Sequence, residues 1–589
     1  MPDPAASGIA AIPTLEQMQQ WTRSLGQAQQ ILMEHAAGVL KDAPHASAAG
    51  YSAPSFPALF NADLLSKVQS DFARESTALW QRFLNAGPDG DTATATLAPR
   101  GDRRFADPKW TENPFFDLIR QSYLLLSDYM LRLTDSVDGL DGRQKEQLRF
   151  AAQGLVDAMA PSNFAFTNPV VLEKTIESSG QNLVRGLKHM LADLGKGQLT
   201  HTDGAAFEPG VNIAATPGKV VKETPLYQLI QYTPTTKTVL KTPLIIFPPW
   251  INRFYILDLS PEKSFVKWAV DQGLTVFVVS WKSADASMKD VDWADYIVRG
   301  QVDAIDTVRD VLDVPDVHAI GYCVAGTTLA ATLAWLAARG EESKVRTATF
   351  FTAQVDFRDA GDLALFVDDE QLKLVEQLAA PGYLDGRYMA ATFNLLRGRD
   401  LIWNYVVSNY LLGEDYAPFD LLYWNGDTTN LPAKWHKGYL ADLYRDNKLA
   451  TPNAISIEGT AIDLRKVRTP SYIQAGREDH IAPAKSVWKI TEHFGGPVRF
   501  VLAGSGHIAG VVNPPGSGKY QYWTCEGPAA TLDSFVAEAK ETKGSWWPDW
   551  IGWITASDME TVPAKAARIP GKGKLPAIED APGRYVKSR

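Results

Sequence analysis

The chain has 589 residues and a formal net charge of −10, from 58 Lys and Arg against 68 Asp and Glu. An acidic chain without a basic run argues against nucleic-acid binding, because neutralising phosphates needs clustered Lys and Arg. Its two cysteines, Cys323 and Cys525, exclude a disulfide framework and suit a reducing compartment. The N-terminus lacks the basic and apolar parts of a secretory signal, and no uncharged apolar stretch reaches the roughly 18 residues that span a bilayer. We therefore expect a cytoplasmic protein with no membrane span.

The first third of the sequence has helical periodicity and no evident strand. Residues 1 to about 100 are rich in Ala, Ser, Pro and Gly, which predicts short helices, such as one over 13–40, on a mobile segment. Residues 86–102 have the composition of a linker. Apolar residues then recur at helical spacing over 114–197. We expect a helical N-terminal domain over residues 1–205.

After residue 205, short apolar runs alternate with helical stretches. Runs rich in β-branched and aromatic residues predict buried strands at 241–250, 273–281, 317–323, 345–357, 471–479 and 497–507. Strands that alternate with helices are typical of a mostly parallel, doubly wound α/β sheet. The interval 357–435 is too long for a plain loop, so we expect it to form a cap over the carboxyl edge of the sheet. The catalytic domain is then residues 206–589.

The strongest local signal for chemistry is the sequence GYCVAG at residues 321–326. It lies between a predicted strand and a helix of small residues, as in a nucleophile elbow, where a sharp turn lifts one side chain above the sheet edge. Cys323 would then lie at a helix N-terminus, where the dipole and the free amides favour a thiolate. The alternative is a buried structural cysteine, which is our interpretation of Cys525 because it has no such setting.

Two downstream loops supply the partners that a thiol nucleophile needs. In α/β-hydrolase folds the acid and the histidine follow the nucleophile in chain order. Asp479 follows one predicted strand and His507 follows the last one, so both leave the same sheet edge as Cys323. Glu478 and His480 are the alternatives. We favour His507 because His480 comes before the last strand, and Asp479 over its neighbour Glu478.

Backbone amides are the expected oxyanion hole, one directly after the nucleophile and one after the first central strand. These positions indicate the N–H groups of Val324 and Trp250. The alternative at Trp250 is a strand that ends in prolines for structural reasons alone. We expect neither a metal nor a cofactor.

At these residues the sequence resembles class I polyhydroxyalkanoate synthases, members of the α/β-hydrolase superfamily. Similar blocks occur in order from about residue 102 to the end of the sequence. Besides the cysteine elbow, they are 248–259 (PPWINRFYILDL), 419–432 (FDLLYWNGDTTNLP), 476–483 (GREDHIAP), 505–515 (SGHIAGVVNPP), 544–550 (GSWWPDW) and 581–587 (APGRYVK). One departure is Ala325, which stands where the family elbow has the first of two paired glycines.

The resemblance implies that Cys323 carries the acyl group, with His507 as base and Asp479 as third member. It implies (R)-3-hydroxyacyl-CoA substrates, short-chain 3-hydroxybutyryl-CoA among them, release of CoA, and a polyester product. It also implies a homodimer that resides on polyester granules beside phasin-type granule proteins. Whether His507 or Asp479 activates the attacking hydroxyl is left open, as is the effect of Ala325 on monomer size.

Two other functions fit parts of the sequence. A cysteine-dependent acyl-CoA thioesterase or related hydrolase would share the fold and the same three side chains. A non-catalytic granule-coating protein would explain the helical first third, but it leaves the Cys, Asp and His set without a use. The tryptophans at 544–553 indicate core packing or, alternatively, contact with an apolar substrate or surface.

Overall fold

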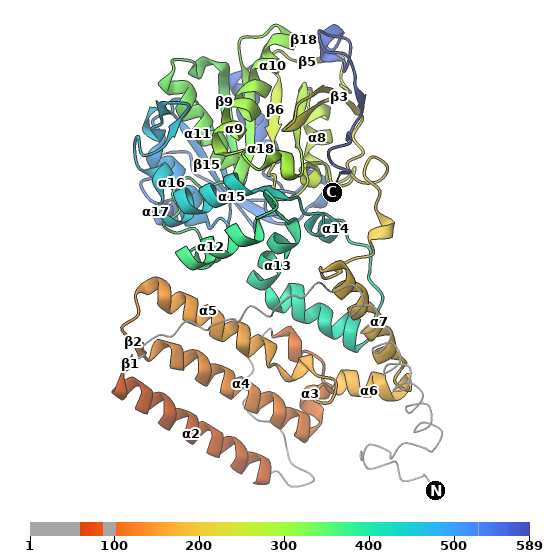
Figure 1. Ribbon diagram of the computed structural model, residues 1–589, viewed down its shortest axis with the longest axis vertical. Helices are drawn as coiled ribbons and strands as arrows, with labels where there is room; N and C mark the ends of the chain where they lie inside the picture. The colour runs from red at the N-terminus through yellow and green to blue at the C-terminus, as the bar shows by residue number, and fades with distance from the viewer. Residues whose placement is uncertain (1–58, 86–101, 528, 589) are drawn as a thin grey trace. The chain divides into compact units, whose positions relative to one another are not determined.

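The structure, a computed structural model, describes residues 59–85, 102–527 and 529–588 (Figure 1). Three expectations fall on residues 1–58 and 86–101: the helix over 13–40, most of the mobile segment and most of the linker. They lie outside the described residues.

The chain divides into two compact units. The first, here called the helical unit, runs to His201 and also contains Ala391–Ala417; the second, the sheet unit, contains the rest. We predicted a boundary at residues 205–206 and a cap, 357–435, lying wholly in the catalytic domain. The structure differs at the cap, because its middle portion packs with the N-terminal helices.

The helical unit is built from the helices coloured orange in Figure 1 and from the inserted segment. Their bounds are α2 Ala62–Asn85, α3 Lys109–Glu112, α4 Pro114–Asp135, α5 Gly142–Ala158, α6 Pro169–Glu177 and α7 Gln181–Lys196, with the π-helices η9 Arg399–Trp403 and η10 Val406–Leu411 in the inserted segment. Helix α4 packs against α2 and α5. Asn113 caps α4 ahead of Pro114, and Asp141 forms a capping box with Gln144 at the start of α5.

We predicted no strand in this region, but the structure has two very short ones. Strands β1 (Leu59–Phe60) and β2 (Val137–Asp138) pair antiparallel. Two residues are too few to produce a period-2 pattern, so hydropathy alone does not reveal them.

Helix α7 holds the inserted segment, 391–417, in the helical unit. The Asn182 side-chain amide donates a hydrogen bond to the Leu411 carbonyl at 2.8 Å. Gly186 allows the backbones to approach closely, since a Cβ there would lie 1.7 Å from the carbonyl oxygen of Tyr410. A side chain at this position of α7 would therefore displace the inserted segment.

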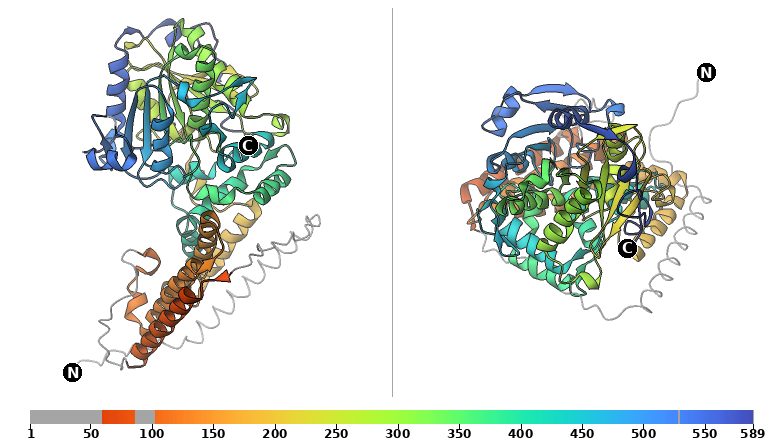
Figure 2. Two further views of the ribbon diagram at one scale, coloured as in Figure 1. Left: turned by 90° about the vertical axis from the view of Figure 1, so that its left-hand side faces the viewer. Right: turned by 90° about the horizontal axis from the view of Figure 1, so that it is seen from above.

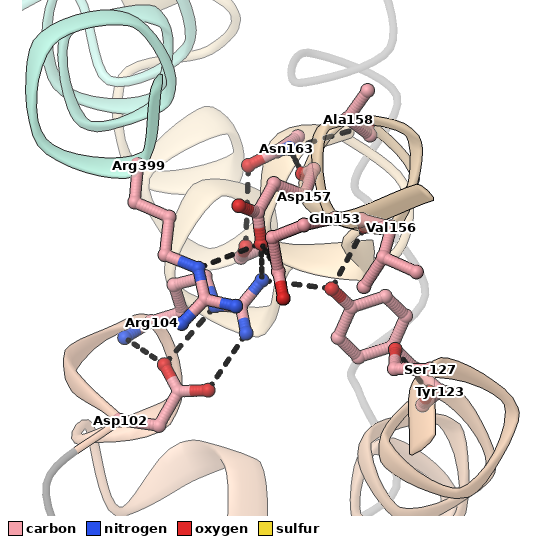
Figure 3. A network of polar contacts seen from close by, with 11 residues as sticks. Asp102, Arg104, Tyr123, Ser127, Gln153, Val156, Asp157, Ala158, Asn163 and Arg399 are labelled. Carbon is pink, nitrogen blue, oxygen red and sulfur yellow. Dashed lines mark hydrogen bonds and ion pairs between the residues drawn. The ribbon is translucent and has the colours of Figure 1, made fainter. Parts of the chain in front are cut away.

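A polar network joins the inserted segment to the N-terminal helices. Figure 3 shows the guanidinium groups of Arg104 and Arg399 converging on the carboxylate of Asp157, at 3.3 and 2.6 Å. Arg104 also pairs with Asp102 at 2.8 Å and donates to the Tyr123 hydroxyl at 2.7 Å. The network thus links parts of the chain that are 242 residues apart.

The sheet unit is built on one 11-stranded sheet, in the order β17-β16-β15-β14-β9-β8-β6-β7-β4-β3-β19. The bounds are β3 Gly218–Glu223, β4 Tyr227–Tyr232, β6 Leu244–Phe247, β7 Val276–Trp281, β8 Val317–Tyr322, β9 Val345–Phe351, β14 Ser471–Gly476, β15 Val498–Ala503, β16 Gln521–Thr524, β17 Lys540–Lys543 and β19 Glu579–Asp580. The six strands from β15 to β7 are parallel, and the strands beyond them on either side are antiparallel.

The parallel strands confirm the predicted α/β fold. Each of the six predicted strands contains one of them, and every residue of β6, β7, β8 and β14 is buried. Alternate residues pack on opposite faces: Ile245 and Phe247 belong to one apolar core, Leu244 and Ile246 to the other. A sheet covered on both faces produces continuous apolar runs, which explains why these strands were visible in the sequence.

Helices cover both faces of the sheet (Figure 2). They are α8 Phe265–Asp271, α10 Asp303–Leu312, α11 Val324–Ala338, α16 Ala484–His493 and α18 Trp547–Ser557, with α9 Trp293–Asp295 and a π-helical turn ahead of α10 and α17 Leu532–Glu538 near β16. The tryptophans 546, 547 and 550 are fully buried against Phe265 of α8, so this cluster is core.

The cap region, here residues 357–445, extends beyond the predicted bounds of 357–435 and joins β9 to the later strands through short elements. They are α12 Asp369–Leu378, β10 Tyr383–Leu384, α13 Gly386–Leu396, α14 Asp420–Gly426, β11 Leu431–Pro432, α15 Ala433–Tyr439 and the π-helix η11 Leu440–Arg445. Strands β10 and β11 pair antiparallel, as do β5 (Thr238–Leu240) with β18 (Thr561–Pro563) and β12 (Ser456–Ile457) with β13 (Thr460–Ala461) elsewhere in the unit.

Candidate active site

Cys323 occupies the sharp turn between β8 and α11. It is the N-cap of α11, with φ +54° and ψ −125°, a left-handed backbone conformation that a non-glycine residue rarely adopts. Its own N–H donates to the Phe351 carbonyl at 2.9 Å, which ties the turn to β9. Strained backbone of this kind persists only where the surroundings impose it, and it gathers at functional sites.

The glycines on either side of Cys323 are required by close packing. A Cβ at Gly321 would lie 2.6 Å from the Gly326 Cα, and one at Gly326 would lie 2.5 Å from the Ala353 Cβ. Ala325, the residue before Gly326, is fully buried and its carbonyl accepts a hydrogen bond from Gln301 Nε2 at 2.9 Å. The extra methyl group is thus accommodated in the apolar core.

Asp479 and His507 lie on two adjacent loops at the same sheet edge. Strands β14 and β15 are in register to their last residues, Gly476 and Ala503, so the two loops start side by side. His507 Nδ1 lies 2.7 Å from Asp479 Oδ2. The Asp479 side chain is completely enclosed, whereas the alternative acid, Glu478, is exposed to solvent.

The second carboxylate oxygen of Asp479 is also engaged. Asp479 Oδ1 accepts backbone N–H groups from Ile481 at 2.8 Å and Ala482 at 2.9 Å. Together with the bond to His507, these contacts hold the carboxylate in one orientation. The other candidate histidine, His480, is half-buried beside it.

The pKa of His507 depends on both Asp479 and Cys323. Burial alone would lower the pKa of the imidazole, but the charges of Asp479 and Cys323, and hydrogen bonds to both, raise that pKa to about 10. The imidazolium is therefore the favoured form of His507 at neutral pH. The Tyr322 hydroxyl donates to the His507 carbonyl at 2.9 Å and fixes the loop.

Two buried tryptophans fasten the loop that follows His507. Trp546 donates from its indole N–H to the Gly510 carbonyl at 2.8 Å, and Trp547 donates to the Val511 carbonyl at 3.0 Å. The tryptophan block in the sequence thus supports the histidine loop from within the core.

The predicted oxyanion residues follow neighbouring strands, Trp250 in a loop and Val324 as the first residue of α11. Strands β6 and β8 pair with Phe247 opposite Gly321, so Trp250 and Val324 both follow the carboxyl ends of adjacent strands. Among the described residues, the backbone N–H groups of Trp250 and Val324 donate no hydrogen bond. Both N–H groups therefore remain candidates for an oxyanion hole.

Sequence reasoning missed two tyrosines of the cap. Burial and the nearby charge of Cys323 both raise the pKa values of the Tyr439 and Tyr444 hydroxyls. The Tyr444 hydroxyl accepts a hydrogen bond from Gln354 Nε2 at 3.2 Å, and Gln354 Oε1 accepts one from the Ser486 hydroxyl at 2.9 Å. No sequence signal separates these tyrosines from ordinary core aromatics of a helical segment.

The remaining candidates have structural surroundings. Cys525 is half-buried, with its thiol 3.5 Å from the Phe535 carbonyl. His318 is buried in β8, and burial lowers its pKa to about 4. Among the described residues, no group of three or more His, Cys, Asp or Glu side chains is placed to hold a metal ion. Within that same part of the chain, every helix is too short or too polar to cross a membrane.

Known families match most of the chain. Residues 101–269 match the family described as "Poly-beta-hydroxybutyrate polymerase (PhaC) N-terminus", and residues 243–514 match "alpha/beta hydrolase fold". Among solved structures, a hydrolase from Pseudomonas aeruginosa PA01 is similar over 50% of this chain and 92% of its own, at 14% identity and a TM-score of 0.29.

Curated relatives are similar over nearly the whole length. The poly(3-hydroxyalkanoate) polymerase subunit PhaC of Rhizobium meliloti is 48% identical over 87% of this chain and 84% of its own. The poly(3-hydroxyalkanoate) polymerase of Methylorubrum extorquens is 47% identical over 89% and 87%. The PhaC subunit of Cupriavidus necator is 41% identical over 92% of both chains.

Proposed function

The chain belongs to the poly(3-hydroxyalkanoate) polymerase (PhaC) family of acyltransferases, and we propose that it polymerises (R)-3-hydroxyacyl-CoA through a thioester on Cys323. Short-chain 3-hydroxybutyryl-CoA is the proposed monomer. The observation that carries the mechanism is the joint placement of Cys323 in a strained turn and of His507 between it and Asp479.

In the first step the Cys323 thiolate attacks the thioester carbonyl. A carbon–sulfur bond forms to Cys323, the bond to the CoA sulfur breaks, and the His507 imidazolium gives its proton to the departing CoA. The N–H groups of Val324 and Trp250 bind the oxyanion. One thioester replaces another, so the acyl group keeps its reactivity for the next step.

In the second step a 3-hydroxyl group attacks the acyl-Cys323 thioester. We propose that the His507 imidazole, left neutral when it protonates CoA in the first step, takes the hydroxyl proton. Asp479 is unsuited to this role because its side chain is enclosed and both oxygens already accept hydrogen bonds. An ester bond forms, and the Cys323 thiolate is released for another cycle.

Water competes with the 3-hydroxyl, so it must be kept from the acyl-enzyme. Tyr439 and Tyr444 of the cap, with Phe357 and Trp435 packed around them, provide an aromatic cover on the side of Cys323. This cover supports polymer formation over hydrolysis.

The direct test is incubation of the protein with 3-hydroxybutyryl-CoA while CoA release and product size are both followed. Polymerisation predicts CoA release together with a product of high mass that remains when the protein is digested. Release of CoA with free 3-hydroxybutyrate as the sole product would instead identify a thioesterase of the same fold. Longer 3-hydroxyacyl-CoA substrates, assayed in parallel, measure the preferred acyl length.

We further propose that the protein works as a cytoplasmic homodimer on polyester granules, beside phasin-type granule proteins. Family membership supports this proposal, and so do large apolar side chains exposed on the helical unit, such as Trp80, Phe115 and Phe166. Replacing these three by Ser should move the protein from the granule fraction to the supernatant while alkylation of Cys323 is unchanged. Analytical ultracentrifugation of the same variants measures the dimer; unchanged granule binding would contradict the assignment of this surface.

A further inference from the structure

Arg253 is buried beside the proposed oxyanion loop although it carries a charge. It is 1% exposed. Its guanidinium donates to the Tyr585 carbonyl at 3.0 Å and to the Ser588 carbonyl at 2.6 Å, and its Nε lies 3.4 Å from Asp427 Oδ1. A buried charge is costly unless every donor finds a partner, so the position of Arg253 is set by these three partners.

The backbone of the same loop is held by α14 and by the chain that follows it. The Thr429 hydroxyl donates to the Trp250 carbonyl, and the Thr429 N–H donates to the Ile251 carbonyl at 3.2 Å. The Trp424 indole donates to the Arg253 carbonyl at 2.7 Å. Residues 250–253 are therefore held both by hydrogen bonds to their backbone carbonyls and through the guanidinium of Arg253.

The 581–588 segment that Arg253 binds is itself fixed to the sheet. The Tyr585 N–H donates to Gln228 Oε1 at 3.1 Å, and the Tyr585 hydroxyl donates to the Thr224 carbonyl at 2.7 Å. Gly583 has φ +81° and no room for a side chain, since a Cβ would lie 2.4 Å from Gln228 Oε1. A rigid support thus lies behind the guanidinium.

We propose that Arg253 is a positioning residue that uses the 581–588 segment as an anchor to hold the Trp250 N–H at the acyl oxygen beside Cys323. The inference rests on the oxyanion role given to Trp250 under the proposed function. Arg253 does not touch the substrate. It fixes a backbone three residues away, where a displacement of about 1 Å costs up to about 100-fold in rate.

The test compares two reactions of Cys323. Acylation by p-nitrophenyl acetate forms a bond from sulfur to the acetyl carbon, breaks the bond to p-nitrophenolate, and passes through an oxyanion. Alkylation by iodoacetamide displaces iodide without an oxyanion, and mass spectrometry of the Cys323 peptide follows it. Arg253→Lys keeps the charge but cannot reach two carbonyls and a carboxylate at once. We expect Arg253→Lys to lower the rate constant of the acylation burst about 10- to 100-fold and to leave the rate constant of alkylation nearly unchanged. The ratio of these two rate constants is the readout.

Two further variants separate positioning from general support. Removal of residues 584–589 leaves Arg253 in the chain but takes away its two carbonyl partners. This truncation should also lower the ratio of the acylation rate to the alkylation rate. Combining this truncation with Arg253→Lys should add little, because both break one interaction. Arg568→Lys is the matched control. Arg568 is also buried and donates to the carbonyls of Leu240 and Lys241. These two residues come just before the amino end of β6, whereas Trp250 follows its carboxyl end.

Arg568→Lys should lower the thermal midpoint but keep the ratio at the wild-type value. An unchanged ratio in Arg253→Lys, an equal fall in Arg568→Lys, or no burst from the wild type would overturn the proposal. If Arg253→Lys does not fold, the truncated protein gives the ratio; if neither folds, Arg253 is a folding residue and the positioning role is wrong. A wild type that gives the burst but releases no CoA from 3-hydroxybutyryl-CoA would contradict the proposed function alone.

Discussion

The two units of the chain are stabilised in different ways. In the sheet unit, four of the parallel strands are buried along their whole length between two apolar cores. The helical unit has a small apolar core around Phe105 and Trp110, exposes Phe166 at 83%, and joins its distant segments through the ion pairs of Asp157. Apolar burial is insensitive to single surface changes, whereas a polar network depends on each member. All three candidate catalytic side chains lie in the sheet unit, whereas the polar network of the helical unit joins segments that are distant in the sequence.

The largest effect should come from the thiol in the elbow. Cys323→Ala removes the proposed nucleophile and should reduce CoA release to background, with circular dichroism unchanged. Cys525→Ala should keep most activity, because that thiol packs at the edge of the apolar core and its hydrogen-bond partner is the backbone carbonyl of Phe535. Similar losses in both variants would place the chemistry elsewhere.

The two histidines of the site should differ sharply. His507→Ala should lower kcat about 10²- to 10⁴-fold, since it removes the proposed base and acid of both steps. His480→Ala should cost far less, because the carboxylate of Asp479 bonds to His507. Steady-state CoA release measures both; a greater loss in His480→Ala would reverse the assignment.

The carboxylate should set the alkaline limit of activity. Asp479 raises the pKa of His507, so Asp479→Asn lowers it, and the imidazolium that protonates the departing CoA is lost at lower pH. The alkaline limb of the pH profile of kcat/KM should therefore move down by about 1 to 3 units. An alkaline limb at the wild-type position would mean that Asp479 does not act on His507.

The smallest expected effect is a loss of stability in the helical unit. Asp157→Asn weakens the contacts with Arg104 and Arg399 and should lower the free energy of unfolding by about 2 kcal/mol, measured by urea denaturation. Asp135→Asn, at an exposed pair with Arg149, should change it by less than about 1 kcal/mol. Alkylation of Cys323 should be the same in both. A slower alkylation in Asp157→Asn would show that the polar network of the helical unit also affects the reactivity of Cys323.

The parallel strands and the three candidate side chains could be predicted because short stretches of sequence indicate them directly. Buried strands produce apolar runs, and Cys323, Asp479 and His507 each follow one of those runs. The outer strands β16 and β17 were not predicted, since QYWT is half-buried, KETK is mostly exposed, and neither shows a clear pattern. They become strands by pairing with a neighbour already in place.

Features that depend on distant partners could not be predicted. Nothing near Arg253 in the sequence indicates that its guanidinium meets carbonyls 332 and 335 residues away. Similarly, Tyr439 and Tyr444 come close enough for the charge of Cys323 to raise their pKa values only through folding, since more than 100 residues separate them from Cys323 in the sequence. The location of the inserted segment in the helical unit depends on Gly186 and Tyr410 meeting across more than 200 residues.

That inserted segment has a consequence for recombining this chain with its relatives. The backbone changes unit after His201, after Ala390 and after Ala417. A chimera that exchanges only the N-terminal part would set a foreign α7 against native residues 391–417, where a single added Cβ at Gly186 collides with the backbone. Crossovers should therefore transfer both pieces together, so that the helical unit is inherited as one module assembled from two separate stretches of coding sequence.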